Sequence, residues 1–104
     1  MSVIPDAVKT SLRQRLRAHA RQSWPQLAAV HVRFRASYGY ISVKLTNGDV
    51  LPSMRLRYGG SPDRWDLAIY KWRKESYEDQ LWFTGSPEES LDFMCEPYLT
   101  KADR

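Results

Sequence analysis

Apolar residues occupy every second position from Val30 to Ala36, and the positions between them hold histidine or arginine. Successive side chains on a strand point to opposite faces, so this pattern predicts a strand with one face in the core and the other in water. The alternation returns from Ile41 to Leu45, after a turn predicted at Ser37-Tyr38-Gly39. A sheet with one solvated face is therefore the expected centre of the fold.

Three further strands are predicted after these two. Asn47-Gly48 favours a tight hairpin turn, because both residues tolerate positive φ. The third strand is predicted from Val50 to Tyr58, a fourth from Trp65 to Arg73 and a fifth from Tyr77 to Phe83. The fourth has apolar residues on both sides, which is typical of a central strand, and the Gly59–Asp63 segment before it is predicted to be a loop.

A helix is predicted near each end of the chain. Between Pro5 and Ser23 apolar residues recur every four positions, which gives the helix one apolar face. Ser86-Pro87-Glu88-Glu89 is typical of a helix start, with Ser86 as the cap and Glu89 completing a capping box. In the helix that follows, four residues are predicted to point inward: Leu91, Met94, Cys95 and Tyr98.

These elements predict a single α+β domain over residues 1–104. Short connections between consecutive strands favour a meander. The expected architecture is an N-terminal helix, an antiparallel sheet of three to five strands and a C-terminal helix, with both helices on one face of the sheet.

The sequence also predicts a cytoplasmic protein that does not enter membranes. No apolar run approaches the roughly 20 residues that span a bilayer, and the first residues do not have the pattern of a secretory signal. The one cysteine cannot form an internal disulfide, so a reducing compartment is the expected location.

Charge is segregated along the chain. Residues 1–48 carry eight Lys or Arg residues against one acid, and residues 49–104 carry eight against eleven, so the two parts have net charges of +7 and −3, which sum to +4. A segregated field of this kind attracts polyanions or orients another protein. It can also let one subunit dock on another.

Cations and an aromatic ring are predicted to gather on the solvated face of the sheet. The predicted anion-binding or nucleic-acid-binding residues are Arg33, Arg35, Lys44, Arg55, Arg57 and Tyr40. Guanidinium groups bind phosphates and flat rings stack on bases, so this set is suited to RNA or single-stranded DNA. Two alternatives stay open: a solvated face whose arginines pair with acids such as Asp66 and Glu78, and a protein interface rich in Arg, Trp and Tyr.

The N-terminal helix carries a second basic surface, here called the helix stripe. Its residues are Lys9, Arg13, Arg17 and Arg21. Such a stripe can follow a phosphate backbone or an anionic membrane, and it can equally be a solvated face. A third possibility is that the acidic final helix lies beside it, within the molecule or across a subunit boundary.

No catalytic residue, metal site or cofactor is predicted, and the protein is expected not to be an enzyme. His19 and His31 lack the spacing of metal ligands. His31, among outward arginines, could act as a neutral base beside a phosphate, but an ordinary surface histidine is the more common case. Cys95 is expected to be buried and inert.

The second half of the chain contains a distinctive set of short segments. They are Arg57–Trp65, Ala68-Ile69-Tyr70, Tyr77-Glu78-Asp79, Gly85–Asp92 and Tyr98-Leu99. This pattern resembles that of a family of small uncharacterised bacterial proteins. The resemblance implies a bacterial source and a family-specific surface around Arg57, Tyr58, Trp65 and Tyr70, and it implies no activity.

The sequence thus favours a small non-enzymatic binding protein for nucleic acid or another anionic partner. The rival interpretation is a protein-interaction or self-assembly module, with Tyr40, Trp72 and Trp82 buried in a homodimer. A weaker one is a small-ligand-binding protein or enzyme. Its apolar pocket would be lined by Trp65, Tyr70 and Phe93.

Overall fold

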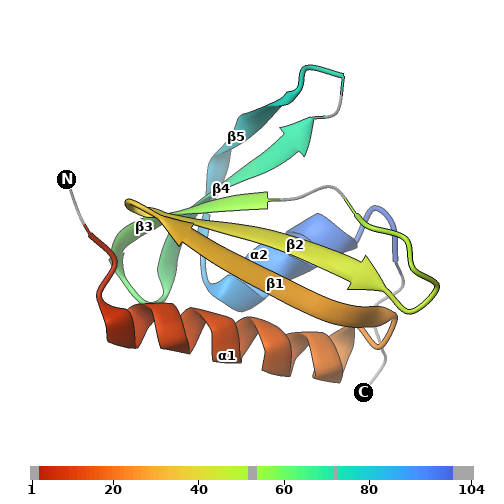
Figure 1. The fold of residues 1–104 in the computed structure, drawn as a ribbon. Helices are drawn as coiled ribbons and strands as arrows, with labels where there is room; N and C mark the ends of the chain where they lie inside the picture. The colour runs from red at the N-terminus through yellow and green to blue at the C-terminus, as the bar shows by residue number, and fades with distance from the viewer. Residues whose placement is uncertain (1–2, 52–53, 72, 100–104) are drawn as a thin grey trace.

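The computed structural model describes residues 3–51, 54–71 and 73–99 (Figure 1). Its elements, in chain order, are α1 (Asp6–Ser23), β1 (Leu27–Arg35), β2 (Tyr38–Leu45), β3 (Met54–Ser61), β4 (Arg64–Lys71), β5 (Ser76–Gly85) and α2 (Pro87–Cys95). The strands form one antiparallel sheet in the order β1-β2-β3-β4-β5. The predicted α+β meander between two helices is confirmed.

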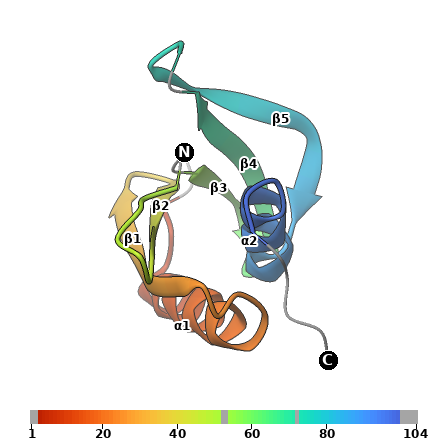
Figure 2. The ribbon, with the colours of Figure 1, turned by 90° about the vertical axis from the view of Figure 1, so that its right-hand side faces the viewer.

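Both helices cover the same face of the sheet, as predicted. α1 packs against β1 and against α2, and α2 packs against β4. The two views show the helices on one side of the twisted sheet, while the tip of the β4–β5 hairpin extends away from them (Figures 1 and 2). Neither α1 nor α2 covers the opposite face of the sheet, which is here called the uncovered face (Figure 2).

The core lies between the helices and the sheet. Its main members are buried side chains of α1 and of the inner faces of the strands: Val8, Leu12, Leu16, Ala20, Val30, Ile41, Val43, Met54, Leu56 and Leu67. Trp24, after α1, and Trp65, on β4, are completely buried. The predicted inward residues Leu91, Met94 and Cys95 of α2 close the core from the other side.

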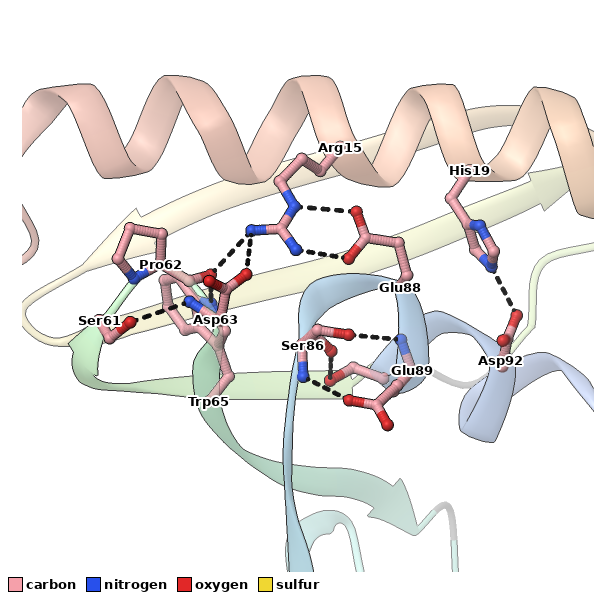
Figure 3. Close-up of polar contacts among 11 residues, drawn as sticks. Arg15, His19, Ser61, Pro62, Asp63, Trp65, Ser86, Glu88, Glu89 and Asp92 are labelled. Atoms are coloured by element: carbon pink, nitrogen blue, oxygen red, sulfur yellow. Dashed lines mark hydrogen bonds and ion pairs between the residues drawn. The ribbon is translucent and has the colours of Figure 1, made fainter.

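The helix ends follow local sequence chemistry. At α2 the Ser86 hydroxyl accepts a hydrogen bond from the Glu89 N–H at 3.2 Å, and the Ser86 N–H donates to the Glu89 carboxylate at 2.9 Å. The predicted capping box is therefore confirmed (Figure 3). At α1 the cap position is Pro5, which offers no side-chain bond, and Asp6 sits in the first turn, where a carboxylate interacts favourably with the helix dipole.

No helix in the described part of the chain is long and apolar enough to cross a membrane.

The first hairpin turn lies earlier in the chain than the predicted Ser37-Tyr38-Gly39 turn. The turn consists of Ala36 and Ser37, and the strand β2 already begins at Tyr38. Ala36 itself adopts the left-handed conformation, with φ of 53°. Gly39 has a packing role instead, because a Cβ there would lie 3.3 Å from both Leu12 and the Phe34 ring.

The third strand also differs from the prediction. It begins at Met54 rather than Val50, and it continues through Gly59-Gly60-Ser61, which was predicted to be loop. The register shifts between Tyr58 and Ser61, and a Cβ at Gly59 would lie 2.7 Å from the Arg64 carbonyl oxygen. The glycines thus allow an irregular end to the β3–β4 hairpin rather than a long loop.

Tyr98 was predicted to point inward, and this is wrong. α2 ends at Cys95, and Tyr98 lies in the turn that follows with 56% of its surface exposed. Because the helical period stops at Cys95, the spacing that carried the prediction no longer applies.

Candidate nucleic-acid interface

Two rows of side chains cross the uncovered face of the sheet. The strand register places the first row in the order Arg33, Tyr40, Arg55, Ala68 and Asp79. The second row, one pleat along, is Arg35, Tyr38, Arg57, Asp66 and Thr84. The predicted cations of β1 and β3 therefore do share one face with Tyr40, since strands β1 to β3 are neighbours. Lys44 shares that face by alternation and pairs with Ala29 at the far end of β2.

Arg55 is held between aromatic rings in the middle of this face. Its guanidinium carbon lies 4.7 Å from the centre of the Tyr38 ring and 5.2 Å from that of Tyr77. A guanidinium over ring faces at these distances makes cation–π contacts. The same group reaches a carboxylate oxygen of Asp79 at 3.4 Å. Arg55 therefore organises the tyrosines and is not an open anion site.

The face is concave where β5 approaches β2. Those strands are separated by β3 and β4, so in a flat sheet their backbones would lie about 14 Å apart, and side chains on them would meet only by leaning toward each other. The Tyr77 ring nevertheless lies 5.7 Å from the Tyr40 ring, edge-on, and 5.3 Å from Tyr70. Partial burial is the main cause that raises the pKa of Tyr77, and the nearby cations Arg55 and Arg33 oppose it. A cluster of tyrosine rings thus borders the cations of β1.

Arg57 is already neutralised. A guanidinium nitrogen of Arg57 lies 2.8 Å from Asp66, and the Thr84 hydroxyl donates to the other oxygen of that carboxylate at 3.0 Å. The alternative of arginines paired by acids of their own chain therefore holds for Arg55 and Arg57. Of the two acids named for that role, Asp66 takes part, and Glu78 pairs with Lys74 at the hairpin tip.

Arg33, Arg35 and Lys44 form no ion pair with any residue that the structure describes. The five predicted cations face two carboxylates, Asp66 and Asp79, so the surface keeps an excess charge of +3. That excess is concentrated toward β1, the edge strand. A hollow of about 470 Å³ lies there, lined by Arg33, Phe34, Arg35, Tyr40 and Tyr77.

The sequence prediction missed Tyr38 and Tyr77 as members of this surface. Tyr38 was assigned to a turn, although its two-residue spacing from Tyr40 was a signal that both lie on one face. Tyr77 could not be placed from the sequence, because its approach to β2 depends on the bend of the hairpin.

The helix stripe lies along the outer edge of β1. The Lys9 ammonium and the Arg13 guanidinium lie 5.5 and 4.9 Å from the centre of the Phe34 ring. Arg17 donates a long hydrogen bond of 3.4 Å to the Val30 carbonyl. The stripe therefore packs beside the strand that carries Arg33 and Arg35.

The acidic final helix does lie beside the basic first helix, but it does not neutralise the stripe. Arg15 makes two hydrogen bonds to Glu88, at 2.8 and 2.7 Å, and lies 2.8 Å from Asp63. One helical turn further on, His19 lies 2.7 Å from Asp92 (Figure 3). These contacts join α1 to α2 on a different side of α1 from the stripe, which stays available to solvent or a partner.

The Arg15–Glu88 pair gives a prediction for acid stability. Arg15 lowers the pKa of Glu88 below its ordinary value, so the pair stabilises the fold above that ordinary pKa and loses its effect as the pH falls through the lower, folded value. We expect the unfolding free energy of the wild type to fall more between about pH 5 and 3 than that of Glu88→Gln. Urea unfolding at several pH values measures this, with exposed Glu96→Gln as control. Parallel curves for the wild type and Glu88→Gln would contradict it.

Cys95 lies in the core, and this gives a prediction for its reactivity. Burial raises the pKa of the thiol to about 12, so it stays protonated at neutral pH. Because the thiolate is the reactive form, we expect no measurable reaction with a disulfide reagent at about pH 8 until the protein is unfolded. Absorbance of the released reagent thiol, with and without urea, is the measurement. Rapid labelling of the folded protein would show that the core opens readily.

Three further features concern a metal site, the alternative ligand pocket and the alternative homodimer interface. Among the described residues, no three His, Cys, Asp or Glu side chains gather as a metal site would require. Trp65 is completely buried in the core while Phe93 is exposed on α2, which does not favour the predicted ligand pocket. Trp72 and the side chain of Trp82, predicted at a homodimer interface, lie outside the described residues.

Comparison of the chain with protein-family models, with curated proteins and with solved structures gave no significant match. The resemblance to small bacterial proteins therefore stays a prediction, and the case for function depends on the geometry of the sheet face and the helix stripe.

Proposed function

We propose that the protein is a non-enzymatic module that binds single-stranded nucleic acid on the uncovered face of its sheet. The observation that supports this most is the position of Arg33 and Arg35. They carry charge that no described carboxylate neutralises, beside a concave cluster of tyrosine rings. Cations for phosphates next to rings for bases are the combination that single-strand-binding surfaces use.

Single strands fit this surface better than a duplex. Tyrosine rings line the hollow at Tyr40 and Tyr77, and they can stack only on bases that are not already paired. A duplex would offer the surface its phosphates alone, and would leave the rings without a partner.

Self-assembly through the same face is less favourable. A two-fold interface places the same patch of two copies together, so the excess of +3 on one copy would meet +3 on the other. Like charges across an interface disfavour association. A polyanion instead gains from each cation that it contacts.

Fluorescence anisotropy with labelled single-stranded RNA and DNA of about 12 nucleotides tests the proposal. Three neutralised phosphates give a slope of about −2 in log affinity against log salt, so a rise from about 50 to 200 mM salt should weaken binding about 20-fold. A duplex of the same sequence should bind more weakly. An affinity that does not change with salt would contradict the proposal.

Measurement of mass in solution at the same two salt concentrations tests the self-assembly rival. We expect 12.2 kDa, the mass of one chain, in both conditions. A dimer that persists in the absence of nucleic acid and hides the tyrosines would favour the rival.

A further inference from the structure

The free edge of β1 is where the sheet face and the helix stripe meet. The Leu51 N–H donates to the Val43 carbonyl at 3.3 Å, so the backbone groups of Val43 face away from β1. Val30, which pairs with Val43, must then turn its own N–H and carbonyl away from β2 and toward the free edge. Arg17 of the stripe donates to that carbonyl, which shows that the stripe reaches the edge itself.

Cations lie on both sides of this edge. Phe34 sits between Arg33 and Arg35 in the sequence of β1, and its ring is contacted by Lys9 and Arg13 from the helix. The two arginines of β1 point to the uncovered face, while the helix cations lie on the other side of the same strand. None of the four stripe residues forms an ion pair within the described part of the chain.

Neighbouring hollows connect the two surfaces. The hollow at Tyr40 and Tyr77 adjoins one of about 260 Å³ that shares Arg33 with it and extends to His31. His31 also lines a third hollow, of about 320 Å³, which lies between β1 and the last turns of α1 and reaches Arg17 and Arg21. The path from the tyrosines to the stripe therefore crosses the edge of β1 at His31.

We propose that a single strand bound on the sheet face continues over the β1 edge at His31 and along the helix stripe. This extension depends on the proposed function and adds a second segment to its site. It makes the part of the stripe at Arg17 and Arg21 a binding surface for the phosphate backbone alone, because the path beyond His31 is lined by cations and aliphatic residues rather than aromatic rings. Short strands would occupy the sheet face, and only longer ones would reach Arg17 and Arg21.

The test combines two oligonucleotide lengths with two pairs of variants. Labelled oligothymidylates of about 5 and about 15 nucleotides are titrated by anisotropy at about 50 mM salt. Arg17→Gln/Arg21→Gln should weaken binding of the longer strand by more than tenfold and leave the shorter one nearly unchanged. Lys71→Gln/Arg73→Gln removes two other exposed cations, at the β4–β5 hairpin, and should affect both lengths little. Circular dichroism checks that each variant is folded.

Two substitutions of His31, where the path crosses the edge of β1, should have opposite effects on binding. His31 is exposed, so His31→Glu and His31→Arg are expected to fold normally. The first should weaken and the second should strengthen binding of the longer strand, with smaller changes for the shorter one. His31→Gln, which leaves this position uncharged, is the control and should behave like the wild type.

The outcomes separate this inference from the proposed function. If Arg17→Gln/Arg21→Gln binds both lengths like the wild type while loss of Arg33 and Arg35 weakens both, the extension is wrong and the sheet-face site stands. The stripe would then serve only to protect the edge of β1 from pairing with other chains. If neither pair of substitutions has an effect, both proposals are wrong.

Discussion

Replacing Arg33 and Arg35 together by glutamine should weaken single-strand binding about 60-fold at about 50 mM salt. Loss of two phosphate contacts makes the slope of log affinity against log salt shallower by about 1.4. With equal affinities at 1 M salt, this difference in slope makes the variant bind about 60-fold more weakly at about 50 mM salt. The effect should shrink as salt is added, because the lost contribution is release of counterions. Anisotropy titrations across a salt series measure both the affinity and the slope.

A charge-balanced variant is the matched control for this experiment. Arg57→Gln/Asp66→Asn removes an arginine and its partner acid from the same face, so the excess charge of the surface does not change. It should bind nearly like the wild type. If it weakens binding as much as loss of Arg33 and Arg35, then general disturbance of the sheet face, and not phosphate contact by the β1 arginines, accounts for the result.

Replacing Trp24 by alanine should have the largest effect on stability, a loss of about 3–5 kcal/mol in the free energy of unfolding. Trp24 is completely buried where α1 ends, and its indole N–H donates to Asp92 of α2 at 2.8 Å. Removing the ring leaves a cavity between the first and last helices and also breaks the polar contact between them. Since small domains have about 5–15 kcal/mol in total, the variant is expected to lose a large share of its stability.

Trp24→Phe separates the two contributions. The phenyl ring keeps most of the buried volume but cannot donate to Asp92, so it should cost much less than alanine, about 1–3 kcal/mol. Urea unfolding followed by far-ultraviolet circular dichroism measures both variants. A loss below about 1 kcal/mol for alanine would mean that the surrounding side chains collapse into the space.

The order of elements was predictable because the sequence is locally consistent with it. The alternation of apolar and polar residues in β1 and β2 identified both strands and the sides of them that face solvent. The Ser86–Glu89 pair marked the start of α2. The strand ends were less predictable. Glycine usually signals a turn, but Gly39 and Gly59 are required by close packing, and an alanine occupies the left-handed position at the first turn.

For the candidate site, the sequence predicted only that its residues lie on one face of the sheet. Alternation places Arg33, Arg35, Arg55 and Arg57 on one side of the sheet, but it does not say which of them an acid will meet. That depends on the register of β4 and β5, which brings Asp66 opposite Arg57 and Asp79 into the row of Arg55. Which side of α1 faces α2 likewise depends on tertiary packing, and the structure places Arg15, and not the stripe, on that side.

The contact between α1 and α2 also constrains how the chain can fold. Arg15 and Glu88 are 73 residues apart, so the contact between the first and last helices can form only after the last helix is available. During synthesis α1 must therefore wait, with part of its apolar side uncovered, until nearly all of the meander has been made. A nascent chain halted before Ser86 would expose that side to chaperones.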